Sequence, residues 1–307
     1  MNKYLLVIIT IVIGNYLNSQ NLEPFEISDE WLTHIQEIAP SKPTTIVKKK
    51  RNILVFSLHT GFKHWTIPHT EAVIMKLANK SGAFNVVSSK YINEFTKEQL
   101  NEYDAIILNN NCSIRPRRNI FLDILDMNKN LTPEEKNKKA GQLENNLLEY
   151  VNNGGGLMVL HGVVTMLNKS RDFSKLVGGS FDYHPKQQMI KVELVNPEHP
   201  MVSAFKGEGF EHVDEPYIFN NAYRDFNFRP LLSMSLNKIK GIKEDSKDDI
   251  SYISWIKKYG KGRVFYCAPS HNPQSYSNPQ FLEFLLDGMQ YVSGDLKCDD
   301  SPINKPK

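Results

Sequence analysis

The sequence predicts a three-layer α/β domain: a mostly parallel sheet with helices on both faces. Segments typical of strands alternate with segments typical of helices from residue 52 onward. The early strand segments, such as 52–58, are continuous apolar runs, which is typical of strands buried on both faces. Glycine and proline stand between many of these segments, where the chain must turn.

Composition excludes several classes of protein. Hydrophobic residues make up 40% and charged residues 23% of the 307 residues, which excludes a disordered or collagen-like chain. A net charge of +3 gives no electrostatic case for binding nucleic acid. The three cysteines, Cys112, Cys267 and Cys298, cannot form a disulfide framework and match no zinc-knuckle spacing.

Residues 1–20 have the layout of a signal peptide. Lys3 is the short positive region, residues 4–13 are an unbroken apolar run, and small and polar residues follow as far as Gln20. The apolar run has about ten residues, whereas a membrane span needs about 20. We therefore expect cleavage, a periplasmic or secreted protein, and no membrane anchor afterwards. An uncleaved anchor is the alternative.

Residues 21–51 are interpreted as an N-terminal tether, and residues 52–294 as the domain. Pro68 suits the first turn of a helix, and Thr96 has the capping-box spacing to Gln99. The elements expected up to residue 109 are a helix at 29–38, a strand at 52–58, a helix at 68–79, a strand at 84–88, a short helix from 97 and a strand at 104–109.

The charged segment 113–142 is predicted to be a helical insertion that forms a lid or a partner surface. It contains candidate helices at 117–127 and 133–139, and a further helix is expected at 143–152. The run Gly154-Gly155-Gly156 then ends that helix and releases the chain into a strand at 157–161. A phosphate loop is disfavoured, because the run precedes a strand and lacks the GxGxxG pattern.

The later strands alternate polar and apolar residues, so an antiparallel portion is expected after residue 185. Residues 295–307 are interpreted as a C-terminal tail. The elements expected in this part are strands at 189–195, 217–219, 230–235, 250–257 and 263–268, and a helix at 279–292.

Histidine and asparagine side chains follow several of the predicted strands. Ligands of open parallel sheets bind at the carboxyl ends of the strands. His64 follows the first strand, Asn109 and Asn110 end the third, His161 ends the fourth and His271 follows the late strand at 263–268. The sequence therefore predicts a site at this edge, although ordinary loop residues are the alternative.

Histidine suits two kinds of chemistry. It titrates near neutral pH and can move protons, and with carboxylates it can hold a divalent metal such as zinc. No HxH or HExxH spacing is present, so metal binding has no sequence signature. A bound metal would be held among His64, His161, His184 and His271. Cys112 lies near a strand end, but no histidine is tied to it in sequence, so a thiol nucleophile is not expected.

An ordered set of short motifs resembles the trehalose-utilisation (ThuA-like) family over residues 52–294. The motifs include Gly61-Phe-Lys-His64, Gly154-Gly-Gly-Leu-Met-Val-Leu-His161, Leu176-Val-Gly-Gly179, Phe181-Asp-Tyr-His184-Pro185 with Gln187, Asp214-Glu-Pro-Tyr217 and Ser270-His271.

The resemblance implies a flavodoxin-like fold of the class I glutamine amidotransferase type. In amidotransferases a cysteine nucleophile occupies the strand-to-helix elbow, and here that position is His161, so glutaminase chemistry is not expected. The family is associated with the use of trehalose and related disaccharides, alongside sugar oxidoreductases. The resemblance therefore implies a sugar or glycoside ligand and an oxidoreductase of the same pathway as a partner.

Two functions fit these observations. The first is an exported carbohydrate-active hydrolase or lyase, with a keto sugar as its most concrete substrate. Its catalytic residues would be His64, His161, His184, His271, Asp214 and Glu215. The second is a non-catalytic sugar-binding module on an amidotransferase-like scaffold. Substrate contacts are expected from Asn109, Asn110, Gln187, Trp65 and Tyr183.

Overall fold

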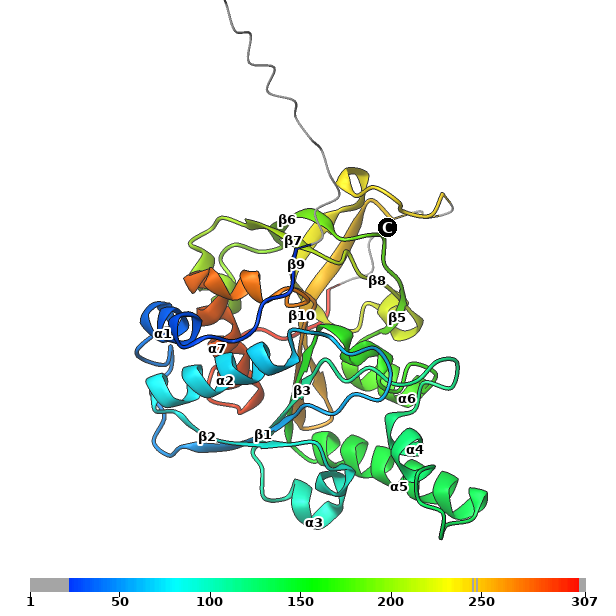
Figure 1. Cartoon of the computed structure of the whole chain (residues 1–307). Helices are drawn as coiled ribbons and strands as arrows, with labels where there is room; N and C mark the ends of the chain where they lie inside the picture. The colour runs from blue at the N-terminus through cyan, green and yellow to red at the C-terminus, as the bar shows by residue number, and fades with distance from the viewer. Residues whose placement is uncertain (1–21, 245, 247, 304–307) are drawn as a thin grey trace, which may run out of the picture.

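The computed structural model describes residues 22–303 except 245 and 247, and it is built around one nine-stranded sheet (Figure 1). The strand order is β2-β1-β3-β4-β11-β10-β9-β6-β7. The strands of this sheet are β1 Arg51–Phe56, β2 Phe84–Ser89, β3 Ala105–Asn109, β4 Gly156–Leu160, β6 Gln188–Leu194, β7 Phe210–Asp214, β9 Arg229–Ser235, β10 Ile250–Tyr259 and β11 Gly262–Cys267.

Five of these strands, β2, β1, β3, β4 and β11, lie side by side and run parallel. β3 and β4 are buried along their whole length, which explains their unbroken apolar runs. Helices cover both faces. The α-helices are α1 Asp29–Ile38, α2 Ile67–Ser81, α3 Lys97–Leu100, α4 Ile120–Leu125, α5 Pro133–Asn152, α6 Arg171–Val177 and α7 Pro279–Val292.

Helices α1, α2 and α7 pack together on one side of the parallel strands, and α3 to α6 group on the other (Figure 1). This arrangement confirms the predicted α/β fold class. Short 3-10 helices join the elements: η1 Ile92–Phe95, η2 His161–Thr165, η3 Pro200–Phe205, η4 Asn221–Asp225, η5 Leu236–Lys238 and η6 Pro273–Ser277.

The sheet becomes antiparallel after β11, since β10, β9, β6 and β7 pair antiparallel in turn. The expected change to antiparallel pairing after residue 185 is therefore confirmed. Two strands, β5 Ser180–Tyr183 and β7, were not predicted. β5 pairs with β8 Ile218–Asn220 in a separate two-stranded sheet.

The charged segment differs from its prediction in two places. The helices expected at 133–139 and 143–152 are one continuous helix, α5, which begins at a capping box between Thr132 and Glu135. Residues 140–142, Ala-Gly-Gln, continue this helix rather than break it. The helix expected at 117–127 is only α4, because Asn119 caps its first turn by accepting from Leu122 N.

Residues 22–50 form an arm that lies along the domain. Thr44 Oγ1 donates to Asp287 Oδ1 of α7 at 2.5 Å, and Thr45 N donates to Gln290 Oε1 at 2.9 Å. Lys80 of α2 donates to three carbonyl oxygens near the end of α1. The predicted helix at 29–38 is confirmed, whereas the predicted signal peptide at 1–20 lies outside the described residues. Within the described ranges, none of the helices combines the length and apolar character that crossing a bilayer requires.

Candidate active site

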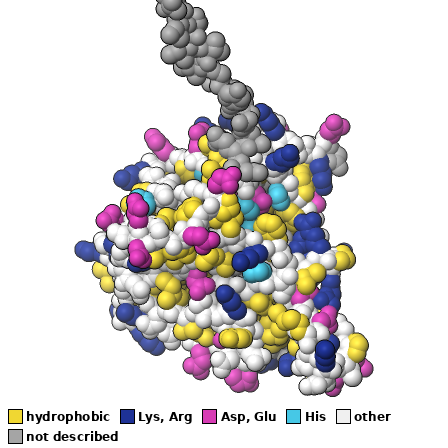
Figure 2. Space-filling view, in the orientation of Figure 1, with side chains coloured by type: hydrophobic (Ala, Val, Ile, Leu, Met, Phe, Trp, Pro, Cys, Tyr) yellow, Lys and Arg dark blue, Asp and Glu magenta, His cyan; other side chains and the backbone are white. Residues whose placement is uncertain are grey.

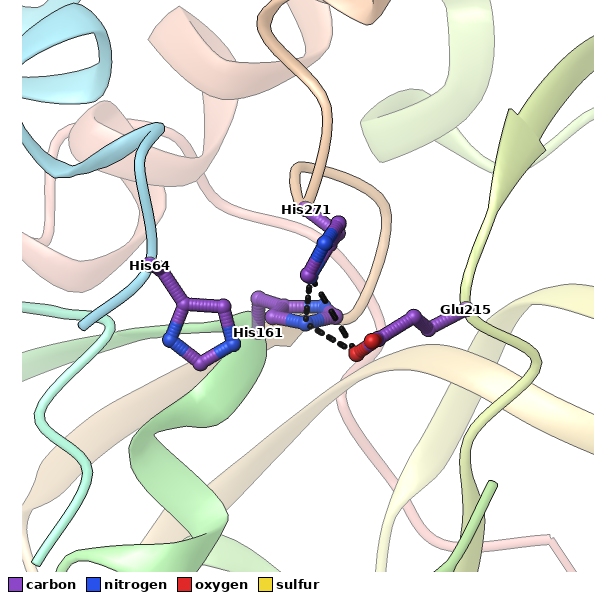
Figure 3. A group of neighbouring side chains, drawn as sticks. All are labelled: His64, His161, Glu215 and His271. Carbon is purple, nitrogen blue, oxygen red and sulfur yellow. Dashed lines mark hydrogen bonds and ion pairs between the residues drawn. The ribbon is translucent and has the colours of Figure 1, made fainter. Parts of the chain in front are cut away.

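Four side chains from distant parts of the sequence meet above the sheet (Figure 3). His64 lies in the loop after β1, His161 follows β4, Glu215 follows β7 and His271 lies in the loop after β11. Each offers one nitrogen or oxygen atom, and these four atoms lie within 4.8 Å of one another. We call these four residues the His–Glu cluster.

His161 occupies a strained turn between β4 and η2. Its φ angle is +45°, a left-handed conformation that costs energy for a residue with a Cβ atom. The main-chain N–H of Gly162 donates to Asn110 Oδ1 at 3.3 Å, and Tyr266 donates its hydroxyl to the His161 carbonyl at 3.2 Å. Strain that is held in place by such contacts is typical of functional positions.

The orientation of the His161 ring is fixed by the main chain. Nδ1 lies 2.7 Å from the carbonyl oxygen of Ala268. A carbonyl oxygen can only accept a hydrogen bond, so Nδ1 carries a proton and donates it. In the neutral ring, Nε2 therefore presents a lone pair to the rest of the cluster.

Glu215 binds two of the histidines through a single oxygen. Its Oε2 lies 3.3 Å from His161 Nε2 and 3.2 Å from His271 Nδ1. Burial alone would raise the pKa of Glu215, but the neighbouring His161 and His271 outweigh burial and lower it. Burial would likewise lower the pKa of His271, whereas the hydrogen bond and the charge of Glu215 raise it. Glu215 is thus an anion at neutral pH.

Asp214 connects two of the main-chain segments that carry the His–Glu cluster. Its Oδ2 accepts from Ser270 N at 3.0 Å, and its Oδ1 accepts from Glu215 N at 2.8 Å. Asp214 is 1% exposed, so it has no access to a substrate. The carboxylate instead joins the end of β7 to the loop that carries His271.

His64 faces the other three residues from the opposite side (Figure 3). Burial, and then the neighbouring His161 and His271, hold the pKa of His64 well below its usual value. His64 is therefore neutral at neutral pH and can accept a proton. Its Nδ1 lies 3.7 Å from Cys112 Sγ. Burial raises the pKa of Cys112 to about 11, so this thiol is not an activated nucleophile.

A cavity of about 510 Å³ opens beside the cluster, with His64 and Glu215 on its wall. Figure 2 shows histidine side chains at the surface near the middle of this view, with hydrophobic and basic side chains close by. The residues that line the cavity are Gly61, Phe62, His64, Cys112, Ser113, Arg115, Arg118, Thr165, Phe181, His184, Glu215 and Tyr217.

His184 lies at the rim of the cavity. Its Nε2 is 3.7 Å from Glu215 Oε1, and its ring stacks on Tyr217 at 5.6 Å between ring centroids. The side chain is 33% exposed, whereas His161 is fully buried. His184 was predicted as a possible metal ligand together with His64, His161 and His271. In the structure, the fourth residue whose ligand atom lies close to those of the other three is Glu215.

The structure does not bring the predicted substrate-binding residues to the cavity wall. Asn109 is fully buried and donates to Ser57 Oγ at 3.0 Å and to the carbonyl of Ile67 at 2.9 Å. Asn110 is also fully buried and supports the His161 turn. Both amides therefore hold main-chain segments in place.

The other three predicted contacts have partners elsewhere. Trp65 packs edge-on against Phe25 of the arm, with ring centroids 5.6 Å apart. Tyr183 accepts from Lys243 N at 3.0 Å. Gln187 Oε1 accepts from Asn272 Nδ2 at 3.0 Å, next to His271 in sequence.

Arg115 and Arg118 were not predicted from the sequence as site residues. Arg118 is only 9% exposed although it lies on the cavity wall. The run Arg115-Pro-Arg-Arg118 closely follows the end of β3, and this basic run near a strand end was the available signal. The start of the charged segment therefore forms one wall of the site.

The family model for ThuA, described as trehalose utilisation, matches residues 52–292. The chain belongs to the ThuA family. No curated protein matches it.

Three solved structures share the fold. A ThuA-like protein from Bacteroides uniformis has a TM-score of 0.60 and 21% identity, covering 81% of this chain and 94% of its own. One from Parabacteroides merdae has a TM-score of 0.56 and 18% identity, covering 80% and 91%. A cytoplasmic protein from Salmonella typhimurium has a TM-score of 0.51 and 15% identity, covering 79% and 98%.

Proposed function

We propose that this ThuA-family protein is an exported enzyme of carbohydrate catabolism. It acts as a hydrolase or a lyase on a sugar or glycoside, and its substrate is a keto sugar. The observation that carries the proposal is the His–Glu cluster beside a cavity of about 510 Å³, with His64 and Glu215 on the cavity wall. Family membership supports the carbohydrate class. The layout of residues 1–20 supports export.

His64 is the proposed general base. It lies on the cavity wall and is neutral, so its ring can take a proton from a carbon next to a ketone or from water. In the elimination, the C–H electron pair forms a carbon–carbon double bond, the neighbouring C–O bond breaks, and the departing oxygen takes up a proton. In the hydrolysis, water supplies the atoms added to the two products.

His184 is the proposed proton donor to the departing oxygen. Its ring is partly open to solvent at the rim, and its Nε2 lies 3.7 Å from Glu215 Oε1. A base and an acid on the wall of one cavity can serve the two ends of a sugar bond. An oxidoreductase of the same pathway would supply the keto sugar.

The experiment is product detection after the purified protein is incubated with matched glycosides and keto-glycosides. We expect release of the leaving sugar from the keto forms, and His64→Gln should lower turnover by about 10²- to 10⁴-fold, the usual contribution of a general base. His34→Gln, on the exposed face of α1, is the matched control. Binding of the sugars without product from any of them would overturn the enzyme proposal in favour of a binding module.

A further inference from the structure

We propose that His161, His271 and Glu215 bind a divalent transition metal, zinc, with the fourth coordination position turned toward His64 and the cavity. This inference deepens the proposed function and rests on it only for the role of the ion. The binding itself rests on the positions of three side-chain atoms.

The three atoms form a nearly regular triangle. His161 Nε2 and His271 Nδ1 are 3.2 Å apart, and Glu215 Oε2 lies 3.3 Å and 3.2 Å from them. Ligands at the usual zinc distances, placed at the corners of a tetrahedron, are separated by about 3.3 Å. The triangle therefore matches one face of a zinc coordination tetrahedron. Two imidazoles with one carboxylate also exclude calcium and magnesium, which prefer oxygen ligands.

The hydrogen bonds around the cluster leave two acceptor atoms, His161 Nε2 and Glu215 Oε2, facing each other. His161 uses its Nδ1 proton on the carbonyl of Ala268 at 2.7 Å, so its Nε2 can only accept in the neutral ring. Glu215 Oε2 is also an acceptor. A single proton on His271 Nδ1 must then serve both neighbours. A cation at the centre of the triangle satisfies all three atoms at once, and the bond from His161 to Ala268 is the support that histidine ligands of metals usually have.

His64 completes the surroundings of the proposed ion without being assigned as a ligand. Its ring centroid lies 5.0 Å from that of His161 and 5.2 Å from that of His271, and Figure 3 shows it apart from the three residues joined by dashed lines. Three protein ligands with an open fourth position are typical of catalytic zinc. The ion would polarise a carbonyl oxygen of the sugar, and His64 would remain free to accept a proton.

Zinc binding to the full chain tests the proposal without any sugar. After chelator treatment and dialysis, titration with Zn²⁺ alone should give one tightly bound ion per chain. His161→Asn and Glu215→Gln should each weaken binding at least tenfold, because even loss of an outer-shell partner costs about 10- to 100-fold. Asn tolerates the left-handed backbone at position 161. His34→Asn, on the exposed face of α1, is the matched control and should bind as wild type.

X-ray absorption at the zinc edge supplies the second readout. We expect nitrogen or oxygen ligands at about 2.0–2.1 Å and no sulfur at about 2.3 Å, which excludes Cys112 as a ligand. Absence of a stoichiometric ion, unchanged affinity in folded His161→Asn, or a sulfur ligand would overturn the proposal. Zinc binding without sugar turnover would instead overturn the proposed function. Turnover by the metal-free protein would support the proposed function and overturn the proposed role of the ion.

A different observation gives a second inference, about the substrate. Arg118 is 9% exposed, lies on the cavity wall and donates to the carbonyl of Ser113 at 2.7 Å. Among the described residues, no carboxylate lies within ion-pair distance of Arg118 or of Arg115 on the same wall. A guanidinium buried without a counter-ion is costly unless a ligand supplies one. We infer that the sugar carries a carboxylate, as in a uronic acid.

Methyl glucuronide and methyl glucoside, which differ by one carboxylate, are the probes. We expect the glucuronide to bind at least tenfold more tightly by calorimetry, since a charge-assisted pair with arginine is among the stronger hydrogen-bonded contacts. Arg118→Gln should remove the difference. Arg224→Gln, which removes the same charge from an exposed surface pair with Asp248, should keep it. Equal affinity of the two probes for the wild type, or no binding of the glucuronide, would overturn the inference.

Discussion

The backbone of Gly162 lies directly against the ring of His64. A Cβ atom at position 162 would come within 2.6 Å of His64 Cε1 and 2.9 Å of Cys112 Sγ. No side chain fits there without displacing His64. The proposed base and the strained turn at His161 are thus packed as one unit.

Gly162→Ala should therefore destabilise the protein by about 1–3 kcal/mol, as overpacking of a core usually does. Part of this cost should disappear when His64 is removed. In a double-mutant cycle with His64→Ala, we expect a coupling of about 0.5–3 kcal/mol, the range found for residues in contact. Urea unfolding of the wild type, the two single variants and the double variant measures this coupling, and additive effects would contradict the close packing of Gly162 against His64.

The backbone at His161 predicts an unusual ranking of two small substitutions. Ala is normally at least as favourable as Gly, but a left-handed φ of +45° penalises any Cβ atom. We expect His161→Gly to be more stable than His161→Ala by about 1 kcal/mol in urea unfolding. The reverse order would show that the turn carries no strain.

Asn109 should behave as a structural residue. Asn109→Ala leaves the Ile67 carbonyl and the Ser57 hydroxyl without their buried donor, so a loss of about 1–3 kcal/mol in the free energy of unfolding is expected. Sugar affinity, measured on folded protein below its unfolding temperature, should not change. A loss of sugar affinity without a loss of stability would contradict this structural role and support the substrate contact predicted from the sequence.

Asp287 should make stability depend on pH. Burial raises the pKa of Asp287 to about 7, against a hydrogen bond from Thr44 that lowers it. In the unfolded chain the carboxyl ionises near pH 4. Between pH 4 and pH 7 the unfolded state therefore loses a proton that the folded state keeps, so stability falls as pH rises through this window.

Asp287→Asn replaces the ionisable carboxyl group with an amide, whose oxygen can still accept the hydrogen bond from Thr44. The free energy of unfolding of the variant, relative to wild type, should rise by about 2–4 kcal/mol from pH 4 to pH 7 and stay level above it. Urea unfolding at a series of pH values measures the difference. A constant difference across the window would show that Asp287 is ionised in the folded protein at low pH.

The sequence predicted the fold well because its signals are local. Continuous apolar runs marked the buried parallel strands, and helix α7 was predicted with its observed bounds, Pro279–Val292. Strand β7 was missed because Phe210-Glu-His-Val-Asp214 is short and carries three polar side chains. That omission matters, since β7 delivers Asp214 and Glu215 to the site.

The site was predicted in part. Histidines at or after the ends of the predicted strands 157–161 and 263–268 were expected at one edge of the sheet. The structure brings these histidines together because β4 and β11 are parallel neighbours. The inward position of Glu215 depends on Asp214 binding Ser270, a contact between residues 56 positions apart. The strand-end rule also counted Asn109, although its amide turns into the protein to pair with the main chain. Strand ends indicate an edge of the sheet, and only packing decides which side chains face the cavity.

The arm joins the beginning of the described chain to its last helix. Thr44 and Asp287 are 243 residues apart in sequence. During synthesis α7 is among the last elements to be made, so the arm can lock only after nearly the whole polypeptide is available. Closing so long a loop is slow compared with forming local helices. A chain cut short before residue 279 would lack the α7 partners of Thr44 and Thr45, so only the contacts with residues such as Lys80 and Trp65 would hold its arm.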